Sequence, residues 1–370
     1  MTQPAPARAP EIGLPITAVD TPALFVDLDA LEHNAATMAR VCRERGVVWR
    51  PHVKASKAPE LAKRLIAAGA VGITCAKVGE AEVMADAGVE DILIANEIVG
   101  PLKIARLVAL AARARVCVAV DDERNLREIS AAAAPAGVTV DLLVDINVGA
   151  NRCGVTPEAA PALARLAIDL PGVGFRGLMG YEGHVMGITD LEEKEARSAA
   201  AASVFAEARR QVEAAGIAVG IMSGGGTGNY WMAARLGSLN ELQAGGGVLL
   251  DQTYSDSMKV PGHRHALFLV AQVISTAVPG RAVGDAGWKA SGQHTGRPLA
   301  VAPAGVTVRG LNAEHTIFEL APGTRVEPGD RVTMIPHYSD STMLLHRRLY
   351  AVRDGVVEAA WPIAGAGMLQ

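Results

Sequence analysis

One lysine has the position and the neighbours that amine chemistry requires. Lys54 follows a short apolar run at 47–49 and precedes a helical segment at 59–68, so we expect it at the end of a strand. If the strands form a βα barrel, that end of the barrel is where side chains do chemistry. Burial and the cationic neighbours Arg50 and His52 would lower the pKa of its amine, which could then form a Schiff base with an aldehyde cofactor. A solvated surface lysine is the simpler alternative, and the rest of the chain decides between them.

A second candidate is the glycine-rich run Ser223-Gly224-Gly225-Gly226-Thr227-Gly228, which follows an apolar run at 219–223. Consecutive glycines let backbone N–H groups converge on an anion, and the Thr227 hydroxyl adds a donor. Phosphate sites in βα barrels commonly lie in these late loops. A flexible turn is the alternative, but the order of this run after the Lys54 strand favours a phosphate site.

Apolar runs rich in β-branched residues alternate with helical stretches through the first two thirds of the chain. The runs are continuously apolar, which is typical of parallel strands buried on both faces. Eight such units fit a closed (β/α)8 TIM-like barrel better than an open doubly wound sheet, and no GxGxxG follows the first strand. The predicted strands lie at 24–27, 47–51, 71–74, 92–95, 116–120, 140–146, 175–180 and 219–223.

The pattern then changes to short β runs separated by Gly and Pro turns. Asp354-Gly355 predicts a hairpin turn, because both residue types accept positive φ angles. These runs lie at 267–274, 281–285, 306–311, 331–335 and 349–352. We therefore expect a flexible tail at 1–20, a barrel at 21–258 and an all-β C-terminal domain at 259–370.

Composition limits the class of protein. The chain has 370 residues, 50% of them hydrophobic and 20% charged, with a formal net charge of -4. This near-neutral balance predicts neither a nucleic-acid nor a membrane partner. The four cysteines are scattered without CxxC spacing, and neither a signal peptide nor a membrane-spanning apolar stretch is recognisable. We expect a soluble cytoplasmic enzyme with a small-molecule substrate.

Several ordered motifs together resemble one enzyme family. They are Arg-Pro-His-x-Lys at 50–54, Asn-x-Gly-x-x-Arg-Cys-Gly at 147–154, Gly-Leu-x-x-Tyr-x-Gly at 177–183, Gly-Gly-Gly-Thr-Gly at 224–228, Glu-Leu-Gln-Ala-Gly at 241–245 and Asp-Ala-Gly-Trp-Lys at 285–289. They are similar to those of fold-type III pyridoxal-phosphate enzymes, whose barrel is of the alanine racemase type. Within that group the chain resembles the D-threonine aldolase and D-serine dehydratase branch from about residue 21 to the C-terminus.

The resemblance implies roles for particular residues. Lys54 would be the Schiff-base lysine, and Gln243 would lie beside the pyridine ring. Tyr181 would reach the phosphate edge of the cofactor, or else cap the barrel core. Arg152 would approach the cofactor's phenolic oxygen or the substrate carboxylate, or else form a surface ion pair. The phosphate would be held by Gly225, Gly226, Thr227 and Gly228.

The same resemblance implies a divalent metal ion (Mg²⁺, Mn²⁺ or Zn²⁺) near the substrate hydroxyl. Asp340 matches the second ligand of the family's motif, but Tyr338 stands where the first ligand, a histidine, belongs. His337 is one residue away, and adjacent side chains of a strand face opposite sides unless a bulge intervenes. A weak site made by His337 and Asp340 is expected, with catalysis without metal as the alternative.

A second departure from the family concerns its proposed catalytic base. The family's histidine falls at Gly187, whereas this chain offers Glu182 and His184 nearby. A histidine titrates near neutral pH, so His184 could act as acid or base, or could simply be hydrogen-bonded in a loop.

The resemblance implies a lyase that acts on a β-hydroxy-D-amino acid, by aldol cleavage or by dehydration. An amino-acid racemase or epimerase on the same fold is the first alternative, and a non-catalytic pyridoxal-phosphate-binding protein is the second. A homodimer is also implied, in which each β domain faces the barrel mouth of its partner.

Overall fold

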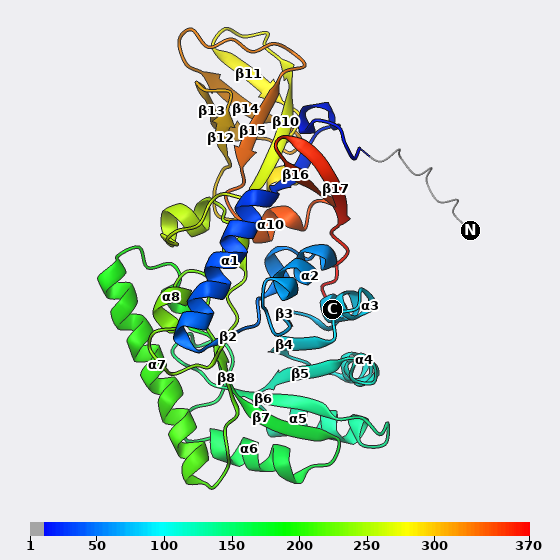
Figure 1. Cartoon of the computed structure of the whole chain (residues 1–370), viewed down its shortest axis with the longest axis vertical. Coiled ribbons are helices and arrows are strands. Elements are labelled where there is room, and N and C mark those ends of the chain that lie inside the picture. The colour runs from blue at the N-terminus through cyan, green and yellow to red at the C-terminus, as the bar shows by residue number, and fades with distance from the viewer. Residues whose placement is uncertain (1–10) are drawn as a thin grey trace, which may run out of the picture.

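Eight parallel strands form the predicted barrel of the alanine racemase type in the computed structural model, which describes residues 11–370. They run in the order β2-β9-β8-β7-β6-β5-β4-β3, and an isolated parallel bridge between His52 and Thr74 links the two end strands. The barrel occupies the lower part of Figure 1. Its strands are β2 (Val48–Trp49), β3 (Ile73–Cys75), β4 (Asp91–Glu97), β5 (Arg115–Val120), β6 (Val140–Asp145), β7 (Val173–Gly180), β8 (Ile221–Gly224) and β9 (Glu241–Leu242).

Helices follow the strands and cover the outside of the barrel, as the alternating pattern predicts. Three of them begin at an aspartate whose carboxylate accepts a backbone N–H of the first turn: Asp27, Asp122 and Asp190. Each such cap stabilises its helix by about 1 kcal/mol. The helices are α1 (Leu28–Arg45), α2 (Pro59–Ala67), α3 (Val78–Asp86), α4 (Pro101–Ala111), α5 (Glu123–Ala133), α6 (Ala160–Asp169), α7 (Leu191–Ala214) and the short α8 (Tyr230–Ala233).

One predicted barrel strand belongs to the other sheet, so this expectation was wrong. β1 (Ala23–Asp27) pairs antiparallel with β10 (Leu267–Ser275) and parallel with β16 (Arg348–Arg353). Central strands of either sheet are buried on both faces, so an apolar run does not distinguish the two positions. The barrel place goes instead to β9, whose first residue, Glu241, is charged.

The C-terminal part forms a sheet of nine strands that includes β1. Its main order is β13-β14-β11-β10-β1-β16-β17, with β15 pairing both β10 and β12. Asp354 and Gly355 make the predicted hairpin turn between β16 and β17, with φ of 49° and 76°. The remaining elements are β11 (Arg281–Gly284), α9 (Trp288–Ser291), β12 (Leu299–Ala302), β13 (Val306–Leu311), β14 (Thr316–Leu320), β15 (Arg331–Ile335), α10 (Ser339–Met343) and β17 (Val356–Pro362).

The first described residues pack against this sheet. The backbone N–H of Ile16 donates to Gly355 at 2.8 Å, and that of Val357 donates to Leu14 at 2.9 Å. The predicted flexible tail at 1–20 therefore does not extend to these residues, and positions 1–10 lie outside the described part. The boundary at 258/259 stays a prediction. β1 precedes this boundary in the sequence but belongs to the sheet of the C-terminal part.

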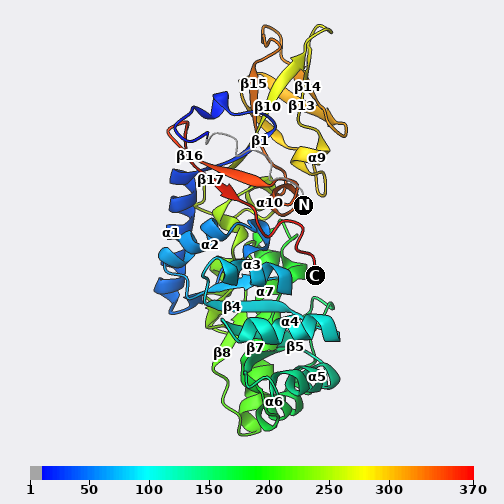
Figure 2. The same ribbon diagram turned by 90° about the vertical axis from the view of Figure 1, so that its right-hand side faces the viewer.

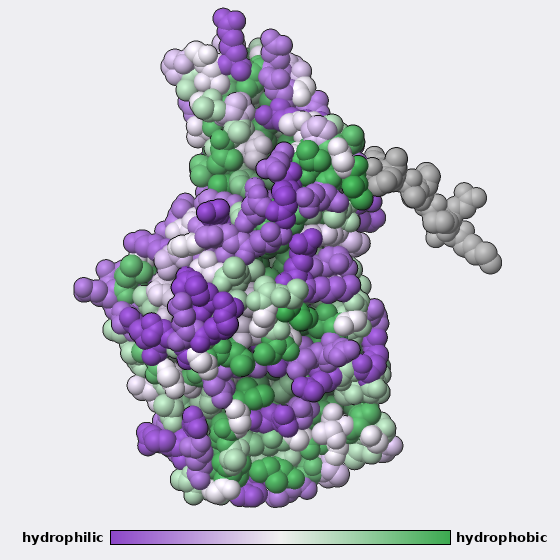
Figure 3. Space-filling model, in the orientation of Figure 1, coloured by the Kyte–Doolittle hydropathy of each residue, from purple (hydrophilic) through white to green (hydrophobic). Residues whose placement is uncertain are grey.

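Figures 1 and 2 show the barrel and the β domain stacked along the long axis of the molecule, with α1 running beside both. On the face drawn in Figure 3, hydrophilic and apolar residues are interleaved over both parts. Within residues 11–370, no helix combines the length and the apolar character needed to cross a membrane.

Candidate active site

A cavity of about 410 Å³ lies where the barrel meets the β domain. Most of its lining comes from segments that follow barrel strands, and Tyr338 is contributed by the β domain. Of the predicted site residues it contains Lys54, Arg152, Tyr181, Gly225, Gly226, Thr227, Gly228 and Gln243. The sequence-based prediction of these eight therefore corresponds to one place in the fold.

Lys54 lies on a short turn of 3-10 helix, η2 (Val53–Ala55), directly after the bridge that closes the barrel. The His52 ring caps this turn, because its Nδ1 accepts the backbone N–H of Lys54 at 3.3 Å. The Lys54 amine lies 3.7 Å from a carboxylate oxygen of Asp340, and its side chain is 41% exposed. The lysine is thus fixed at its base and reaches into the cavity at its tip.

Arg50 and His52 are not the two cationic neighbours that were expected beside Lys54. Burial, followed by the charge of Lys54, holds the pKa of His52 well below its ordinary value, so the ring is neutral near pH 7. Arg50 donates to Asp91 at 2.6 Å and to Glu241 at 2.8 Å, which neutralise its charge inside the barrel. Neither residue is a free cation beside the lysine.

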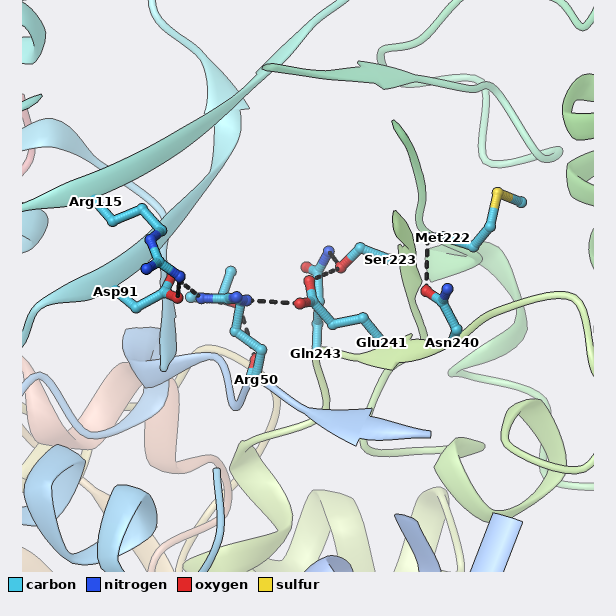
Figure 4. Close-up of polar contacts among 9 residues, drawn as sticks. Arg50, Asp91, Arg115, Met222, Ser223, Asn240, Glu241 and Gln243 are labelled. Carbon is cyan, nitrogen blue, oxygen red and sulfur yellow. Dashed lines mark hydrogen bonds and ion pairs between the residues drawn. The ribbon is translucent and has the colours of Figure 1, made fainter. Parts of the chain in front are cut away.

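Figure 4 shows where these contacts lead. Glu241 also accepts the Ser223 hydroxyl at 2.7 Å, and the Gln243 amide donates to that hydroxyl at 2.9 Å. A chain of polar contacts therefore runs from Arg50 across β9 and β8 to the cavity wall. It fixes the orientation of Gln243, the side chain expected beside the pyridine ring.

The glycine loop follows β8, and its residues 225–228 line the cavity. Gly225 has φ of +81°, a conformation that favours glycine. A β-carbon on Gly226 would lie 2.8 Å from the Met186 sulfur and 3.0 Å from the Tyr181 ring. Gly226 is therefore packed closely against Met186 and Tyr181, which line the cavity with it, and a side chain at this position has no room.

A second glycine segment, Gly245 and Gly246, lines the same cavity directly after β9. A β-carbon on Gly246 would lie 2.3 Å from the Tyr254 hydroxyl oxygen. The Gly247 N–H donates to the Thr227 hydroxyl at 3.3 Å, so the two glycine segments are joined. Sequence reasoning stopped at Gly245, and the run of three glycines was the signal that could have revealed this segment.

Arg152 and Tyr181 are brought together, with the guanidinium 5.4 Å from the centre of the tyrosine ring. Burial and the charge of Glu182 raise the pKa of Tyr181 to about 12, so its phenol is a neutral donor near pH 7. The Arg152 loop is tied down through Gly154, whose N–H donates to Asp121 at 2.9 Å. This places a cation at the rim of the cavity, as expected for a carboxylate-binding group.

Carboxyl groups gather beneath that loop. Asp145 is buried at the end of β6, and burial together with Glu97 raises its pKa to about 8. Glu97, Asp121 and Cys153 form the one group of three or more potential metal ligands found among residues 11–370. Neither Asp340 nor His337 belongs to it.

The structure does not bring His184 into the cavity. Its ring lies against Gly149, where a β-carbon would be 3.1 Å from the imidazole Cε1, and the residue is exposed. Glu182 is buried and accepts the Asn229 amide at 2.9 Å. A catalytic role for His184 stays a prediction without geometric support.

His337 and Asp340 point to different surroundings. The His337 Nδ1 lies 2.7 Å from the Thr295 hydroxyl and 3.3 Å from that of Thr253. Asp340 instead lies beside Lys54 and accepts the Tyr254 hydroxyl at 3.5 Å. β15 ends at Ile335, and in the segment that follows it Tyr338, rather than His337, lines the cavity.

Asn96 and Tyr254 are polar cavity residues that were not assigned to the site from the sequence. Tyr254 lies on a π-helical turn, η5 (Thr253–Ser257), that joins the barrel to the β domain. π-helical turns inside a chain are frequent at functional sites, but no sequence motif announces one.

The barrel, the appended β domain and a cavity in which a lysine faces a glycine loop define the class of fold-type III pyridoxal-phosphate enzymes. The chain matches the family described as alanine racemase, N-terminal domain, over residues 26–252. It matches a second family, the putative serine dehydratase domain, over residues 266–352.

Relatives span the whole chain. It is 40% identical to D-threonine aldolase of Arthrobacter sp over 368 residues, which are 98% of this chain and 96% of that one. It is 36% identical to 3-hydroxy-D-aspartate aldolase of Paracoccus denitrificans (strain Pd 1222) over 96% of this chain and 94% of that one. The crystal structure of D-threonine aldolase from Filomicrobium marinum superposes with a TM-score of 0.94 at 38% identity, covering 99% of this chain and 100% of that one. The chain belongs to the D-threonine aldolase and D-serine dehydratase-like branch of the alanine racemase family, as predicted.

The cavity residues fit pyridoxal phosphate, the cofactor of this family. Lys54 would supply the amine, and the loop at 225–228, which lines the same cavity, would hold the phosphate. Tyr181 and Arg152 add a neutral donor and a cation at the edge. Gln243 supplies a neutral amide, held by Ser223, where the ring nitrogen is expected.

Proposed function

We propose that this chain is a pyridoxal-phosphate-dependent lyase that cleaves a β-hydroxy-D-amino acid into glycine and an aldehyde. The observation that carries the proposal is the Lys54 amine, which faces the glycine loop across the cavity and has the Asp340 carboxylate 3.7 Å away. The full-length similarity to D-threonine aldolase and 3-hydroxy-D-aspartate aldolase supports the same reaction.

In this proposal each group of the chain has one task. The Lys54 amine holds the cofactor aldehyde and later takes up or gives back a proton. Bound pyridoxal phosphate supplies the electron sink for the pair left on Cα when the Cα–Cβ bond opens. Arg152 holds the substrate carboxylate, and the glycine loop holds the phosphate through backbone N–H groups. The neutral Gln243 amide leaves the ring nitrogen without a charged partner.

Product analysis tests the proposal directly. Purified enzyme loaded with pyridoxal phosphate is incubated with D-threonine and with D-3-hydroxyaspartate, and the products are separated. Glycine and an aldehyde in equal amounts support aldol cleavage. An inverted stereocentre would replace the proposal by the racemase or epimerase alternative, and unchanged substrates would favour the non-catalytic binding protein.

Dehydration is the second candidate, because the C-terminal part matches the putative serine dehydratase domain over residues 266–352. The two lyase reactions differ in the bond that breaks, Cα–Cβ in cleavage and Cβ–O in dehydration. A keto acid and ammonia in the same incubation would identify dehydration.

The assembly and the compartment are part of the proposal. Exposed apolar side chains on the β domain, such as Trp288, Leu299 and Val301, support a homodimer in which that domain faces its partner. All four cysteines are free thiols, which fits the reducing cytoplasm. Light scattering on the purified protein tests the dimer.

A further inference from the structure

The surroundings of Asp340 are unlike a binding site for a divalent metal, although the family uses one together with pyridoxal phosphate. Its carboxylate has the Lys54 ammonium at 3.7 Å and the Tyr254 hydroxyl at 3.5 Å, and the Tyr338 hydroxyl is directed to the same carboxylate. All three neighbours are hydrogen-bond donors. A phenol keeps its proton near neutral pH and so donates rather than coordinates, which leaves Asp340 without a second metal ligand from either tyrosine.

The histidine that was expected to complete a metal site is engaged elsewhere. The His337 ring interacts with the hydroxyls of Thr253 and Thr295, and its carbonyl accepts the Thr253 N–H at 2.9 Å. Among residues 11–370, no group of three convergent His, Cys, Asp or Glu side chains includes Asp340. One carboxylate between hydrogen-bond donors does not fit Mg²⁺, Mn²⁺ or Zn²⁺, whose sites need several oxygen, nitrogen or sulfur ligands.

Asp340, Tyr254 and Tyr338 together do fit an alcohol. A hydroxyl group donates one hydrogen bond and accepts others. Asp340 is an acceptor, whereas Tyr254 and Tyr338 are donors whose rings lie side by side, with centres 6.0 Å apart. Tyr254 and Tyr338 line the cavity, and Asp340 is within reach of the amine at which the reaction takes place.

This arrangement is built into the junction of the two parts of the chain. Asp251 is fully buried and accepts two backbone N–H groups, that of Tyr254 at 3.0 Å and that of Ser339 at 2.6 Å. It therefore clamps the turn that carries Tyr254 to the turn that carries Tyr338 and Asp340. Side chains held in this way lose little freedom on binding, which favours recognition of a small group.

We infer that Asp340, Tyr254 and Tyr338 form a metal-independent site for the β-hydroxyl group of the substrate, an inference that rests on the proposed lyase function. In aldol cleavage Asp340 takes the hydroxyl proton while the Cα–Cβ bond breaks. The hydroxyl-bearing carbon leaves as an aldehyde, and the electron pair of the broken bond goes to Cα. The tyrosine hydroxyls donate to the oxygen as it becomes a carbonyl.

The first test measures metal and needs no substrate. Elemental mass spectrometry of the wild-type holoenzyme should find far less than one divalent metal per chain, and calorimetry should detect no tight Mn²⁺ binding. Tyr338→His places an imidazole beside Asp340, and we expect it to bind Mn²⁺ roughly tenfold more tightly or better. One tightly held metal per wild-type chain would overturn the inference, as would a Tyr338→His holoenzyme that binds no more Mn²⁺ than wild type.

The second test measures turnover of D-threonine by the same holoenzymes. Wild-type activity should survive exhaustive chelation, whereas that of Tyr338→His should depend on added Mn²⁺. Asp340→Asn should lose roughly 100-fold or more, and Tyr338→Phe roughly tenfold, with the cofactor absorbance retained. Tyr350→Phe is the matched control, because the Tyr350 hydroxyl bonds Glu11 in the β domain. Loss of wild-type activity on chelation would overturn the inference.

The two proposals fail in different ways. A wild-type chain without metal that releases no aldehyde from any β-hydroxy-D-amino acid would overturn the lyase assignment, and with it the hydroxyl-binding role. The absence of a metal site would still be supported by the binding data. A metal-dependent aldolase would instead confirm the lyase and overturn only the inference about Asp340.

Discussion

Two lysines three residues apart, Lys54 and Lys57, have opposite surroundings in this structure. Lys57 is buried and paired with the Glu80 carboxylate, whereas Lys54 ends in the cavity with Asp340 beside it. Burial turns one into a structural ion pair, and the strand end leaves the other accessible to a ligand. Their local sequences do not distinguish them; the order of the surrounding motifs does.

Replacing Lys54 by alanine should abolish the near-visible absorption of the bound cofactor and lower turnover by roughly 100-fold or more, because both the covalent attachment and a proton carrier are lost. Absorption spectra and steady-state rates of the holoenzyme measure the effect. Lys63→Ala is the control, since Lys63 pairs with Glu60 on the exposed face of α2. A Lys54→Ala protein with full activity would contradict its role.

Gly226→Val should weaken pyridoxal-phosphate binding about tenfold or more while the fold persists. The reason is steric, because a β-carbon there would press on Met186 and Tyr181, and overpacking of this kind typically costs about 1–3 kcal/mol. Equilibrium dialysis measures the affinity. Gly187→Ala, where a β-carbon meets no atom within 4 Å, is the matched control. Equal affinity in both variants would remove the loop from the phosphate site.

Asp145 should make the protein less stable as pH rises. Burial, then Glu97, raises its pKa from 3.8 to about 8, so between about pH 4 and pH 8 the folded state binds a proton that the unfolded state releases. The free energy of unfolding therefore falls as the pH rises across that window. Asp145→Asn should flatten the dependence and gain roughly 1 kcal/mol or more at pH 8. Denaturant unfolding from pH 5 to 9 measures the free energy of unfolding of each variant. Asp169→Asn, at an exposed position, is the control. Parallel curves for wild type and Asp145→Asn would refute the prediction.

At the scale of elements, the sequence predicted whether a segment is a helix or a strand better than it predicted which strands pair with one another. Most apolar runs became barrel strands, and Asp27, Asp122 and Asp190 begin helices as their residue type favours. β1 was misplaced, because its partners β10 and β16 are specified only by contacts distant in sequence. β9 was missed since it has two residues and opens with Glu241, whose charge is satisfied inside the barrel by Arg50.

The site residues, too, were predictable where local sequence sets their position and not where distant contacts do. Residues fixed by local motifs, such as Lys54 and the glycine loop, were predictable because a strand end or a run of glycines is visible in the sequence. Tyr254 was not, because a π-helical turn brings it to the cavity and a buried aspartate, Asp251, holds that turn in place. The unexpected engagement of His337 also depends on Thr253 and Thr295, which no motif connects to it.

At the scale of the whole molecule, the β domain is incomplete without the start of the chain. β1 lies between β10 and β16 in the middle of the nine-stranded sheet. A fragment of residues 259–370 should therefore fail to melt cooperatively, because its sheet is split and two strand edges are unpaired. Fusing residues 11–27 to it through a linker should restore a cooperative transition in circular dichroism. A stable, cooperatively melting 259–370 fragment would show that the predicted boundary marks an independent domain.

The central place of β1 also has a consequence for how a ribosome produces this enzyme. Phe25 emerges long before its antiparallel partner Phe268 and its parallel partner Tyr350. At about 5–20 residues per second, the ribosome needs roughly 15–60 s to synthesise the stretch of about 300 residues from Phe25 to Tyr350. β1 has no partner strand until β10 has been made, and its second edge stays unpaired until β16 follows. The nascent chain thus offers chaperones a hydrophobic segment for most of that interval, and the active site, which needs both parts, does not form before the segment around Tyr338 has been made.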